Sequence, residues 1–583
     1  MFLILLFQLL MNAFFTTFSQ RLVLLAGLLL GLAATAWAQV PAWQTIVTAA
    51  PLNANSGALV TASTTDASGN TYVAGSFTGS INLNGTTYTS VGVRDLFIAK
   101  WSPATQGFVW VQQSAASDSQ GADILVSSGS SVYLAGSFYG TASIGGTTLV
   151  SAGGSDAFVA KLTDAGSSAS FAWAQRMGGA GYDSANGLAV SSTAVYVSGT
   201  VTGTATFGST SYTSAGSIDG FLTKLTDAGS SATFTWTQLM GGLSGDYASG
   251  LAAQGTSLYV LGSYMGVVAF GSLSLNSGNK PGLFVAKLTD TGLSATYTWV
   301  QQAGSSTNIV PNALALQGSQ VYVAGRFQGT ATFGSISVPN ASTTTAAFDA
   351  FVAKLTDAGS SATFAWAYGA GGPRSDYASA LAVRGSTVYV AGSYSGTASF
   401  GGATITSSGT SDDIFVARLT DLGPTASFAW VQTAGGPGVD TVQGLAPVAT
   451  AVYVGGSVIG AAAFGSQTVG SASAGQAGFF AALPDATSLA ATASTPAAAG
   501  VNVFPTPTPA HGTATVQLPA GLATGSLTLT VLDGLGRIVR TRAAILPAGT
   551  TATSFDVAGL APGVYALRVA VGERLGTARL VVE

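Results

Sequence analysis

Aspartate is the residue whose placement in this chain could support chemistry. One set of Asp stands ten residues after a recurring Trp, in Gly-rich loops such as "MGGAGYDSA", and a second set opens a recurring strand phrase of the type "DAFVAKL". The first set is Asp183, Asp246, Asp376 and Asp440, and the second is Asp95, Asp156, Asp219, Asp349 and Asp413. Grouped carboxylates can accept hydrogen bonds from sugar hydroxyls, ligate Ca²⁺ or, as a pair, hydrolyse a glycosidic bond.

Other catalytic groups are scarce. The chain has no Cys, its single histidine is His511, and its two glutamates are Glu573 and Glu583. A Ser-His-Asp triad or a His-based zinc site therefore cannot be built in the long region before them. The Asp residues recur with a sequence repeat, whereas a catalytic pair usually breaks symmetry. We expect no catalytic residues and no enzyme, and an Asp-dependent polysaccharide-degrading enzyme stays as the alternative.

The two Asp sets have two interpretations. They could form a ligand face of loops that binds sugars or calcium, or each carboxylate could hold its own loop by accepting backbone N–H bonds. We favour the second, because the D-x-D-x-D-G spacing that gathers calcium ligands is absent. We accordingly expect no cofactor and no metal site, with calcium as a weakly supported exception.

A third series places a cation three residues before an Asp, in the phrase K/R-L-T-D. Its members are Lys161–Asp164, Lys224–Asp227, Lys287–Asp290, Lys354–Asp357 and Arg418–Asp421. We interpret them as exposed pairs at strand exits, each of which contributes little to stability.

The elements that position these residues belong to a repeat. The phrase "VYVAGSF" and its variants align seven tyrosines, Tyr72, Tyr133, Tyr196, Tyr259, Tyr322, Tyr389 and Tyr453, at spacings of 61, 63, 63, 63, 67 and 64 residues. Each unit also holds the "FVAKL" phrase, a short apolar run such as "NGLAV" and, in six units, a Trp phrase. Short β-rich segments separated by Gly, Ser, Asp and Thr turns indicate four strands per unit.

Seven four-stranded units predict an all-β fold, a seven-bladed β-propeller, in which each blade packs both faces against its neighbours. We expect the Tyr phrase to be the inner strand and the Trp residues to be inter-blade core. The last unit lacks a Trp strand, while Trp43 precedes the first unit, so the N-terminal strand is predicted to complete blade seven.

Both Asp sets should then lie on one face of the disc. Two segments depart from the consensus and could form a pocket there: 82–95 and the longer 335–351.

The combination of "VYVAGSF", "FG" and "D.FVAKL" at one period resembles the bacterial SBBP propeller repeat over residues 43–485. That resemblance implies the propeller fold, with no common activity attached to it.

The N-terminus predicts export. Arg21 precedes the apolar run 22–34, and "AWA" before Gln39 predicts signal cleavage between Ala38 and Gln39. The run is short for a membrane span, so we expect no transmembrane segment in the mature chain.

Residues 1–20 are also apolar and carry no positive charge. A start codon assigned too early, with Met11 or a nearby codon as the true start, would explain them.

The tail differs from the repeats. A linker at 486–500 is followed by strands at 501–583 whose alternation and turn density predict a small β-sandwich domain. This stretch resembles the type A C-terminal sorting domain of the type IX secretion system. The matching pieces are "VLDGLGRIV" and "FDVAGLAPGVYALRV", which contain Asp533, Gly536, Leu560, Pro562, Gly563 and Tyr565, while "VFPTPTP" departs from the family's opening element. The resemblance implies the type IX machinery as a partner.

These observations predict four parts: a signal peptide (1–38), a propeller (39–485), a linker (486–500) and a sorting domain (501–583). With a formal net charge of −4 and 7% charged residues, nucleic acid is not an expected partner. We expect a secreted or cell-surface protein that binds or adheres to a glycan, protein or matrix. A structural surface-layer component is the other non-catalytic alternative.

Overall fold

The computed structural model describes residues 40–342, 346–471 and 475–485 of the first part of the chain. Further along it describes 502–504, 508–509, 512–517, 525–532, 538–546, 552–571 and 574–582. The chain divides into two compact units, one ending at Asp485 and the other beginning at Ala486. The predicted signal peptide, the cleavage site at Ala38 and Gln39, and the predicted linker 486–500 lie outside the described residues.

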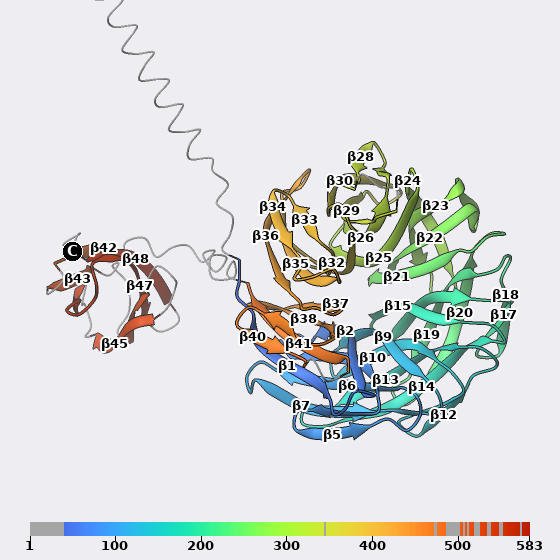
Figure 1. The fold of residues 1–583 in the computed structure, drawn as a ribbon, viewed down its shortest axis with the longest axis horizontal. Helices are drawn as coiled ribbons and strands as arrows, with labels where there is room; N and C mark the ends of the chain where they lie inside the picture. The colour runs from blue at the N-terminus through green and yellow to red at the C-terminus, as the bar shows by residue number, and fades with distance from the viewer. Residues whose placement is uncertain are drawn as a thin grey trace, which may run out of the picture. The chain divides into compact units, whose positions relative to one another are not determined.

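Within 40–485 the strands form seven four-stranded antiparallel blades (Figure 1). Blade one consists of β2 (Gly57–Thr65), β3 (Thr71–Thr78), β6 (Asp95–Ser102) and β7 (Gly107–Gln113). Blade two consists of β9 (Gln120–Ser128), β10 (Ser131–Phe138), β13 (Asp156–Asp164) and β14 (Ala169–Gly179). Blade three consists of β15 (Ser184–Ser191), β16 (Ala194–Val201), β19 (Asp219–Asp227) and β20 (Ala232–Met240). Blade four consists of β21 (Tyr247–Gln254), β22 (Ser257–Phe270), β23 (Leu273–Asp290) and β24 (Ala295–Ser305). Blade five consists of β25 (Asn308–Gln317), β26 (Gln320–Gln328), β29 (Asp349–Asp357) and β30 (Ala362–Ala370). Blade six consists of β31 (Asp376–Arg384), β32 (Thr387–Tyr394), β35 (Asp413–Asp421) and β36 (Ala426–Ala434). Blade seven consists of β37 (Thr441–Pro447), β38 (Ala451–Val458), β41 (Ala477–Pro484) and β1 (Gln44–Pro51).

The ring is closed by the N-terminal strand, as predicted. β1 pairs antiparallel with β41, where Thr48 lies opposite Phe479. The innermost strands of neighbouring blades contact one another around the ring, and β37 of blade seven contacts β2 of blade one. Figure 1 shows the blue β1 beside the orange β41 and β38. The fold is therefore an all-β propeller without an open end.

The strand order corrects one prediction. The innermost strand is the short apolar run, such as β15, and the Tyr phrase forms the second strand, such as β16. The glycine in each Tyr phrase is required by the neighbouring inner strand, because a Cβ at Gly199 would collide with the carbonyl oxygen of Ser184. A β-bulge in the inner strand, between Ala185 and Gly187, accompanies that close approach.

Between its second and third strands each blade carries a hairpin, which the four strands predicted per unit do not include. The hairpins are β4–β5 (Ser80–Leu83, Thr86–Thr89), β11–β12 (Thr141–Ile144, Thr147–Val150), β17–β18 (Thr204–Phe207, Thr210–Thr213), the distal parts of β22 and β23, β27–β28 (Thr330–Phe333, Ile336–Pro339), β33–β34 (Thr397–Phe400, Ala403–Thr406) and β39–β40 (Ala462–Phe464, Gln467–Val469). They pair with the outer edge of the preceding blade: β4 with β1, β17 with β14 and β27 with β24, while β11 pairs with β8 (Ala115–Ala116), the short strand after blade one. The hairpins thus cover outer-strand edges that would otherwise be unpaired.

The K/R-L-T-D series also requires a correction, because its pairs are neither exposed nor within one blade. The Lys161 ammonium contacts the Asp227 carboxylate of the next blade at 2.6 Å. The Tyr133 hydroxyl and the Trp173 indole N–H of the Lys161 blade donate to the same carboxylate at 2.7 and 2.9 Å. Lys–Asp pairs recur at five interfaces, as Lys100–Asp164, Lys161–Asp227, Lys224–Asp290, Lys287–Asp357 and Lys354–Asp421, and Arg418–Asp485 takes this place at the sixth. The Trp residues at these interfaces are buried between blades, as predicted.

The seventh interface, between blades seven and one, is built differently. Ala482 stands where the other blades carry Lys or Arg, and Pro103 follows Ser102 where they carry Asp. Aromatic packing replaces the ion pair: Tyr453 stacks on Phe480 with ring centroids 5.0 Å apart, and Trp101 meets Phe480 edge-on at 5.9 Å. The closing seam is therefore apolar.

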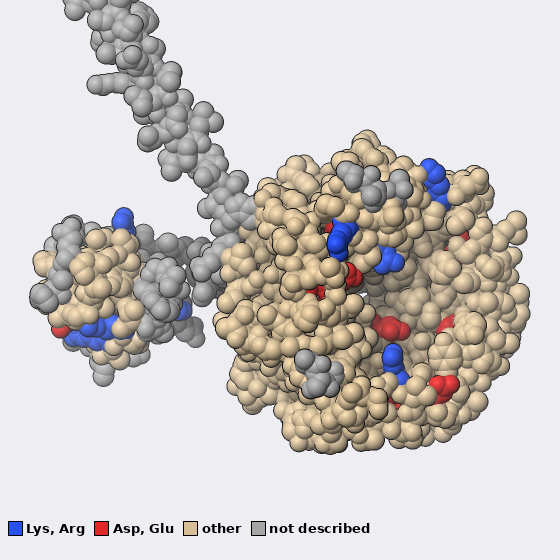
Figure 2. Space-filling view, viewed as in Figure 1, with Lys and Arg blue, Asp and Glu red and all other residues tan. Residues whose placement is uncertain are grey.

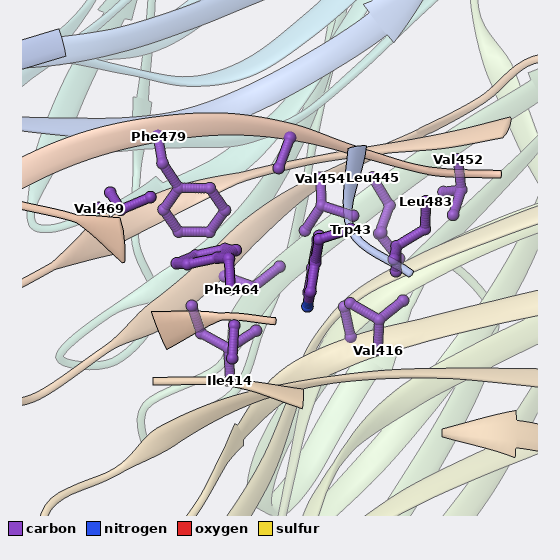
Figure 3. Close-up of a cluster of buried hydrophobic side chains, with 14 of the residues drawn as sticks. Trp43, Ile414, Val416, Leu445, Val452, Val454, Phe464, Val469, Phe479 and Leu483 are labelled. Atoms are coloured by element: carbon purple, nitrogen blue, oxygen red, sulfur yellow. The ribbon is translucent and has the colours of Figure 1, made fainter. Parts of the chain in front are cut away.

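Trp43 lies beside β41, as predicted, but not at the position of the other strand Trp residues. In β1 it is Gln44 that stands opposite Ala482, and Thr45 has a positive φ of 40° at a register shift. Trp43 consequently faces blade six, where its indole N–H donates to the Thr433 carbonyl at 2.8 Å. Figure 3 shows its ring among Ile414, Val416 and Val454.

The second unit holds two small sheets that share an apolar core, which includes Val516, Leu529, Phe555, Leu567 and Leu580. They are β42 (Asn502–Phe504), β43 (Thr513–Gln517) and β46 (Ala552–Asp556), and β45 (Ile538–Leu546), β44 (Gly525–Leu532), β47 (Gly563–Val571) and β48 (Arg574–Val582).

Among the predicted sorting residues, Leu560 is buried, Pro562 is exposed, and Gly563 begins β47. The Tyr565 hydroxyl donates to the Ala561 carbonyl at 2.7 Å, which fastens the start of that strand to the preceding turn. Asp533 and Gly536 lie outside the described residues.

Candidate binding face

The two predicted Asp sets lie on one face of the propeller. We call it the loop face: it carries the connections from each outer strand to the next inner strand and from each second strand to the third. The turn face is the opposite one, with the tight turns inside each blade. Asp183 and Asp156 show the proximity of the sets, because a Cβ at Gly178 would lie 2.7 Å from an oxygen of Asp156 and 2.8 Å from one of Asp183.

The side chains of both Asp sets are buried, at 3% exposure or less, and so do not form an exposed ring of acceptors. Asp183 accepts backbone N–H bonds from Gly179 at 2.7 Å and Thr202 at 2.9 Å. Asp440 accepts equivalent bonds from Gly436 at 2.7 Å and Ile459 at 3.2 Å. Each carboxylate thus ties the Gly-rich loop to the end of the following blade's second strand.

The second set holds the segment before the third strand. Asp219 accepts the backbone N–H of Ala215 at 2.7 Å, and Asp95 accepts that of Val91 at 2.9 Å together with the Gln113 amide at 2.9 Å. Asp156 receives Arg176 as an ion-pair partner. The carboxylates of both Asp sets therefore support the loops from within and do not form the surface of the loop face.

Burial without enough compensating charge raises the pKa of several of these carboxyls. Desolvation is the largest cause in each case. It raises the pKa of Asp376 to about 8 and that of Asp440 to about 7, with the neighbouring Asp349 and Asp413, respectively, adding to the rise. Asp246 and Asp349 reach about 6. Around neutral pH part of this set is protonated, which suits a structural hydrogen-bonding role.

The loop face exposes apolar side chains beside polar ones such as Arg94, Asp118 and Arg374. Its exposed large apolar side chains are Leu52, Val91, Val93, Tyr139, Tyr182, Leu243, Tyr247, Met265, Val267, Val439 and Ile459, whereas the described turn face has Leu293 and Leu422. The same unit also exposes Val40, Val109 and Val150. Leu243 is 90% exposed and Tyr182 is 67% exposed, both at the tips of outer-to-inner loops. The exposed large apolar side chains are thus distributed unequally between the two faces. Sequence reasoning missed these residues because they vary from blade to blade.

A polar ring lines the inner edge of the disc, formed by the bulged residue of each inner strand: Thr61, Asp123, Asn186, Ser249, Asn312, Ser379 and Gln443. Asn186 and Asn312 donate to the carbonyls of Ala248 and Ala378 in the following blades, at 3.2 and 2.8 Å. Asp123, the one charged member, is exposed, and partial desolvation by the surrounding inner strands raises its pKa to about 6. Figure 2 shows the central hollow and the sparse charged side chains around it.

The described residues contain no group of three or more His, Cys, Asp or Glu side chains arranged to hold a metal ion. A small gap between blades five and six is lined by apolar side chains and Tyr368, so it offers no acid–base pair.

Comparison with known proteins identifies the tail. Residues 502–583 match the family described as the secretion system C-terminal sorting domain. No curated protein matches the chain. A search of the described residues also yields no helix with the length and hydropathy to span a bilayer.

Among solved structures, a Trypanosoma rangeli sialidase is 10% identical, with 78% of this chain and 83% of that one covered and a TM-score of 0.32. A glycoside hydrolase family 32 protein from Bifidobacterium adolescentis is 9% identical, with 92% and 95% covered and a TM-score of 0.25. These similarities concern the fold alone. The chain is thus an all-β propeller protein that carries a type IX C-terminal sorting domain and is secreted or held at the outer cell surface.

Proposed function

We propose that this protein is a non-catalytic binding or adhesion module, an SBBP-type propeller whose loop face contacts a glycan, protein or matrix outside the cell. The observation that carries the proposal is the concentration of exposed apolar and aromatic side chains on that face, with Leu293 and Leu422 as their counterparts on the turn face. Aromatic rings exposed at loop tips supply stacking area for sugars or apolar side chains.

The alternatives fit less well. An Asp-dependent polysaccharide-degrading enzyme needs carboxylates that a substrate can reach, and the two Asp sets are buried and bonded to backbone N–H groups. A structural surface-layer component would not require one face to differ from the other in this way. We therefore place binding first and the surface-layer role second.

The test uses the mature chain from Gln39 onward, purified and fluorescently labelled. We expect it to bind a subset of a glycan array, a matrix protein or whole cells, and to lose that binding when Tyr182→Ser and Leu243→Ser are combined. The matched control combines Leu293→Ser and Leu422→Ser on the turn face. Equal binding by both double variants would refute the assignment of the loop face.

A further inference from the structure

Blade five breaks the repeat at one position of its second strand. Six blades place a small hydroxyl residue directly after the Gly of the Tyr phrase, namely Ser76, Ser137, Thr200, Ser263, Ser393 and Ser457. Blade five has Arg326 there. Arg326 lies opposite Val310 of the inner strand and Ala350 of the third strand, near the loop-face end of all three strands. A large cation has thus replaced a small neutral group at one point of an otherwise regular ring.

Two aromatic rings hold this guanidinium. Its central carbon lies 5.2 Å from the ring centroid of Phe348 and 5.0 Å from that of Tyr377. The two rings are 6.1 Å apart, so the three groups form a triangle and the guanidinium is not enclosed between the rings. Phe348 comes from the long segment 335–351, and Tyr377 is the second residue of β31, the inner strand of blade six. Both partners lie on the loop face.

The charge of Arg326 is not neutralised by a partner in the described residues. None of the ion pairs formed there includes it, and its Nε lies buried without a hydrogen-bond acceptor. Asp349 and Asp376, the sequence neighbours of Phe348 and Tyr377, each accept one backbone N–H through Oδ2, from Ala341 and Gly372 respectively, and their Oδ1 atoms are buried without a hydrogen-bond partner. Neither carboxyl forms an ion pair with Arg326. A guanidinium held in place by rings and lacking a counter-ion is a prepared site for a planar anion, above all a carboxylate.

We propose that Arg326 is the carboxylate-binding residue of the loop face and that the ligand class is an acidic polysaccharide, one that contains uronate sugars. This inference rests on the proposed function and gives it a ligand. The guanidinium binds the uronate carboxylate through parallel N–H···O bonds, and the rings of Phe348 and Tyr377 present apolar surface to the sugar beside it. A neutral glycan leaves the cation unpaired and gains only the ring contact.

The experiment compares oligogalacturonate with a neutral cello-oligosaccharide of equal length by calorimetric titration of the mature chain. We expect oligogalacturonate to bind more tightly and Arg326→Ser to weaken it by about tenfold or more, the range of hydrogen bonds to charged groups. Arg326→Ser installs the residue that five other blades carry, so the propeller should retain its melting temperature. Arg384→Ser, which removes an exposed cation at a turn-face turn, is the matched control and should bind as the unmodified chain does.

Three outcomes overturn the inference: no preference for oligogalacturonate, binding that Arg326→Ser leaves unchanged, or an equal loss in Arg384→Ser. Retained binding to cells or matrix in that case leaves the proposed function standing. If the unmodified chain binds neither oligosaccharide, cells nor matrix, the proposed function fails together with the inference. Arg326→Lys separates charge from geometry, because a lysine keeps the charge without the planar fork and should recover only part of the affinity.

Discussion

Tyr133 and Asp227 lie 94 residues apart in neighbouring blades, yet the Tyr133 hydroxyl donates a 2.7 Å hydrogen bond to the Asp227 carboxylate. Lys161 and Trp173 converge on the same carboxylate, so a single Asp receives three side chains from the preceding blade. Burial raises the pKa of Asp227, but the hydrogen bonds from Lys161 and Tyr133 outweigh it and leave that pKa below its usual value. The carboxylate is thus the fixed point of one blade interface.

Asp227→Asn should be strongly destabilising. It removes the negative charge while Lys161 stays buried, and breaking a buried pair in this way costs about 3–5 kcal/mol of the free energy of unfolding. Urea denaturation of the mature chain measures the loss. Asp118→Asn changes an exposed Asp on the loop face and should leave the midpoint within error. A small effect of Asp227→Asn would mean that water reaches Lys161.

Stability should depend on pH in two opposite ways. The pKa of Asp376 rises to about 8 in the folded protein and that of Asp440 to about 7. A raised folded pKa means that the stabilising contribution is full at low pH and is lost as pH rises through the folded value. The melting temperature should therefore fall as pH rises from about 4, the ordinary pKa of an Asp carboxyl, to about 8. Asp376→Asn, which cannot ionise, should flatten that fall.

The opposite trend belongs to the inter-blade Asp residues. Asp164 and Asp227 have lowered pKa values, because hydrogen bonds from Lys100 and Lys161 outweigh the effect of burial. Their contribution is present above the unfolded pKa and is lost as pH falls through the lowered folded value. The melting temperature should thus pass through a maximum near pH 4, where the two trends meet. A melting temperature that rises steadily up to pH 8 would contradict the raised pKa values.

The sequence predicted the number of blades and the closure of the ring, but not the order of the strands within each blade. Period, strand phrases and the displaced N-terminal strand predicted seven blades and their closure, because each follows from local pattern and from the need to pair edges. It placed the Tyr phrase innermost because a strand that is apolar on both faces was expected nearest the axis, whereas β16 is buried along both faces in the second position and the inner strand β15 is only partly buried. The feature that distinguishes the second strand from the innermost one is the close approach of Gly199 to Ser184 across the bulge, and the spacing of residues in the sequence does not reveal this approach.

The candidate site was predicted in outline only. Alternation of up and down strands is enough to put Asp183 and Asp156 on one face, and the structure has them there. Their burial depends on loops that fold over them, which a repeat consensus does not report. The pairing of Lys161 with Asp227 rather than Asp164 was missed because it joins residues 66 apart, whereas K-L-T-D suggests a local pair. Arg326 could have been found as the one departure from a column of Ser and Thr.

Trp43→Ala should loosen the closing strand first. The indole fills space among Ile414, Val416 and Phe464, and removing a buried Trp costs about 3–5 kcal/mol. Hydrogen exchange followed by mass spectrometry should show faster exchange in β1 and β41 than in β15 and β16 on the far side of the ring. Trp173→Ala is the comparison, because it should instead speed exchange at the interface of blades two and three. Uniform acceleration in both variants would show that the ring opens as one unit.

Loop-face variants should separate binding from folding. Tyr182, 67% exposed, and Leu243, 90% exposed, gain no packing energy, so their replacement by Ser should leave the melting temperature within about 1 °C. Any partner of the loop face loses their apolar contact, and we expect an at least tenfold weaker Kd. Leu293→Ser, at 85% exposure on the turn face, removes a comparable apolar surface and should leave the Kd unchanged.

Gly392→Ala tests how the inner strand is held. A Cβ at Gly392 would collide with the carbonyl oxygen of Tyr377, so the second strand of blade six must move away from the bulge or the bulge must flatten. Either response disturbs Tyr377, and with it the ring that supports Arg326. We expect a lower melting temperature and weaker oligogalacturonate binding in one variant. Gly409→Ala is the control, because no atom lies within 4 Å of its added Cβ. An unchanged Gly392→Ala protein would mean that the bulge adapts freely, and the strict glycine at this position would then need another cause.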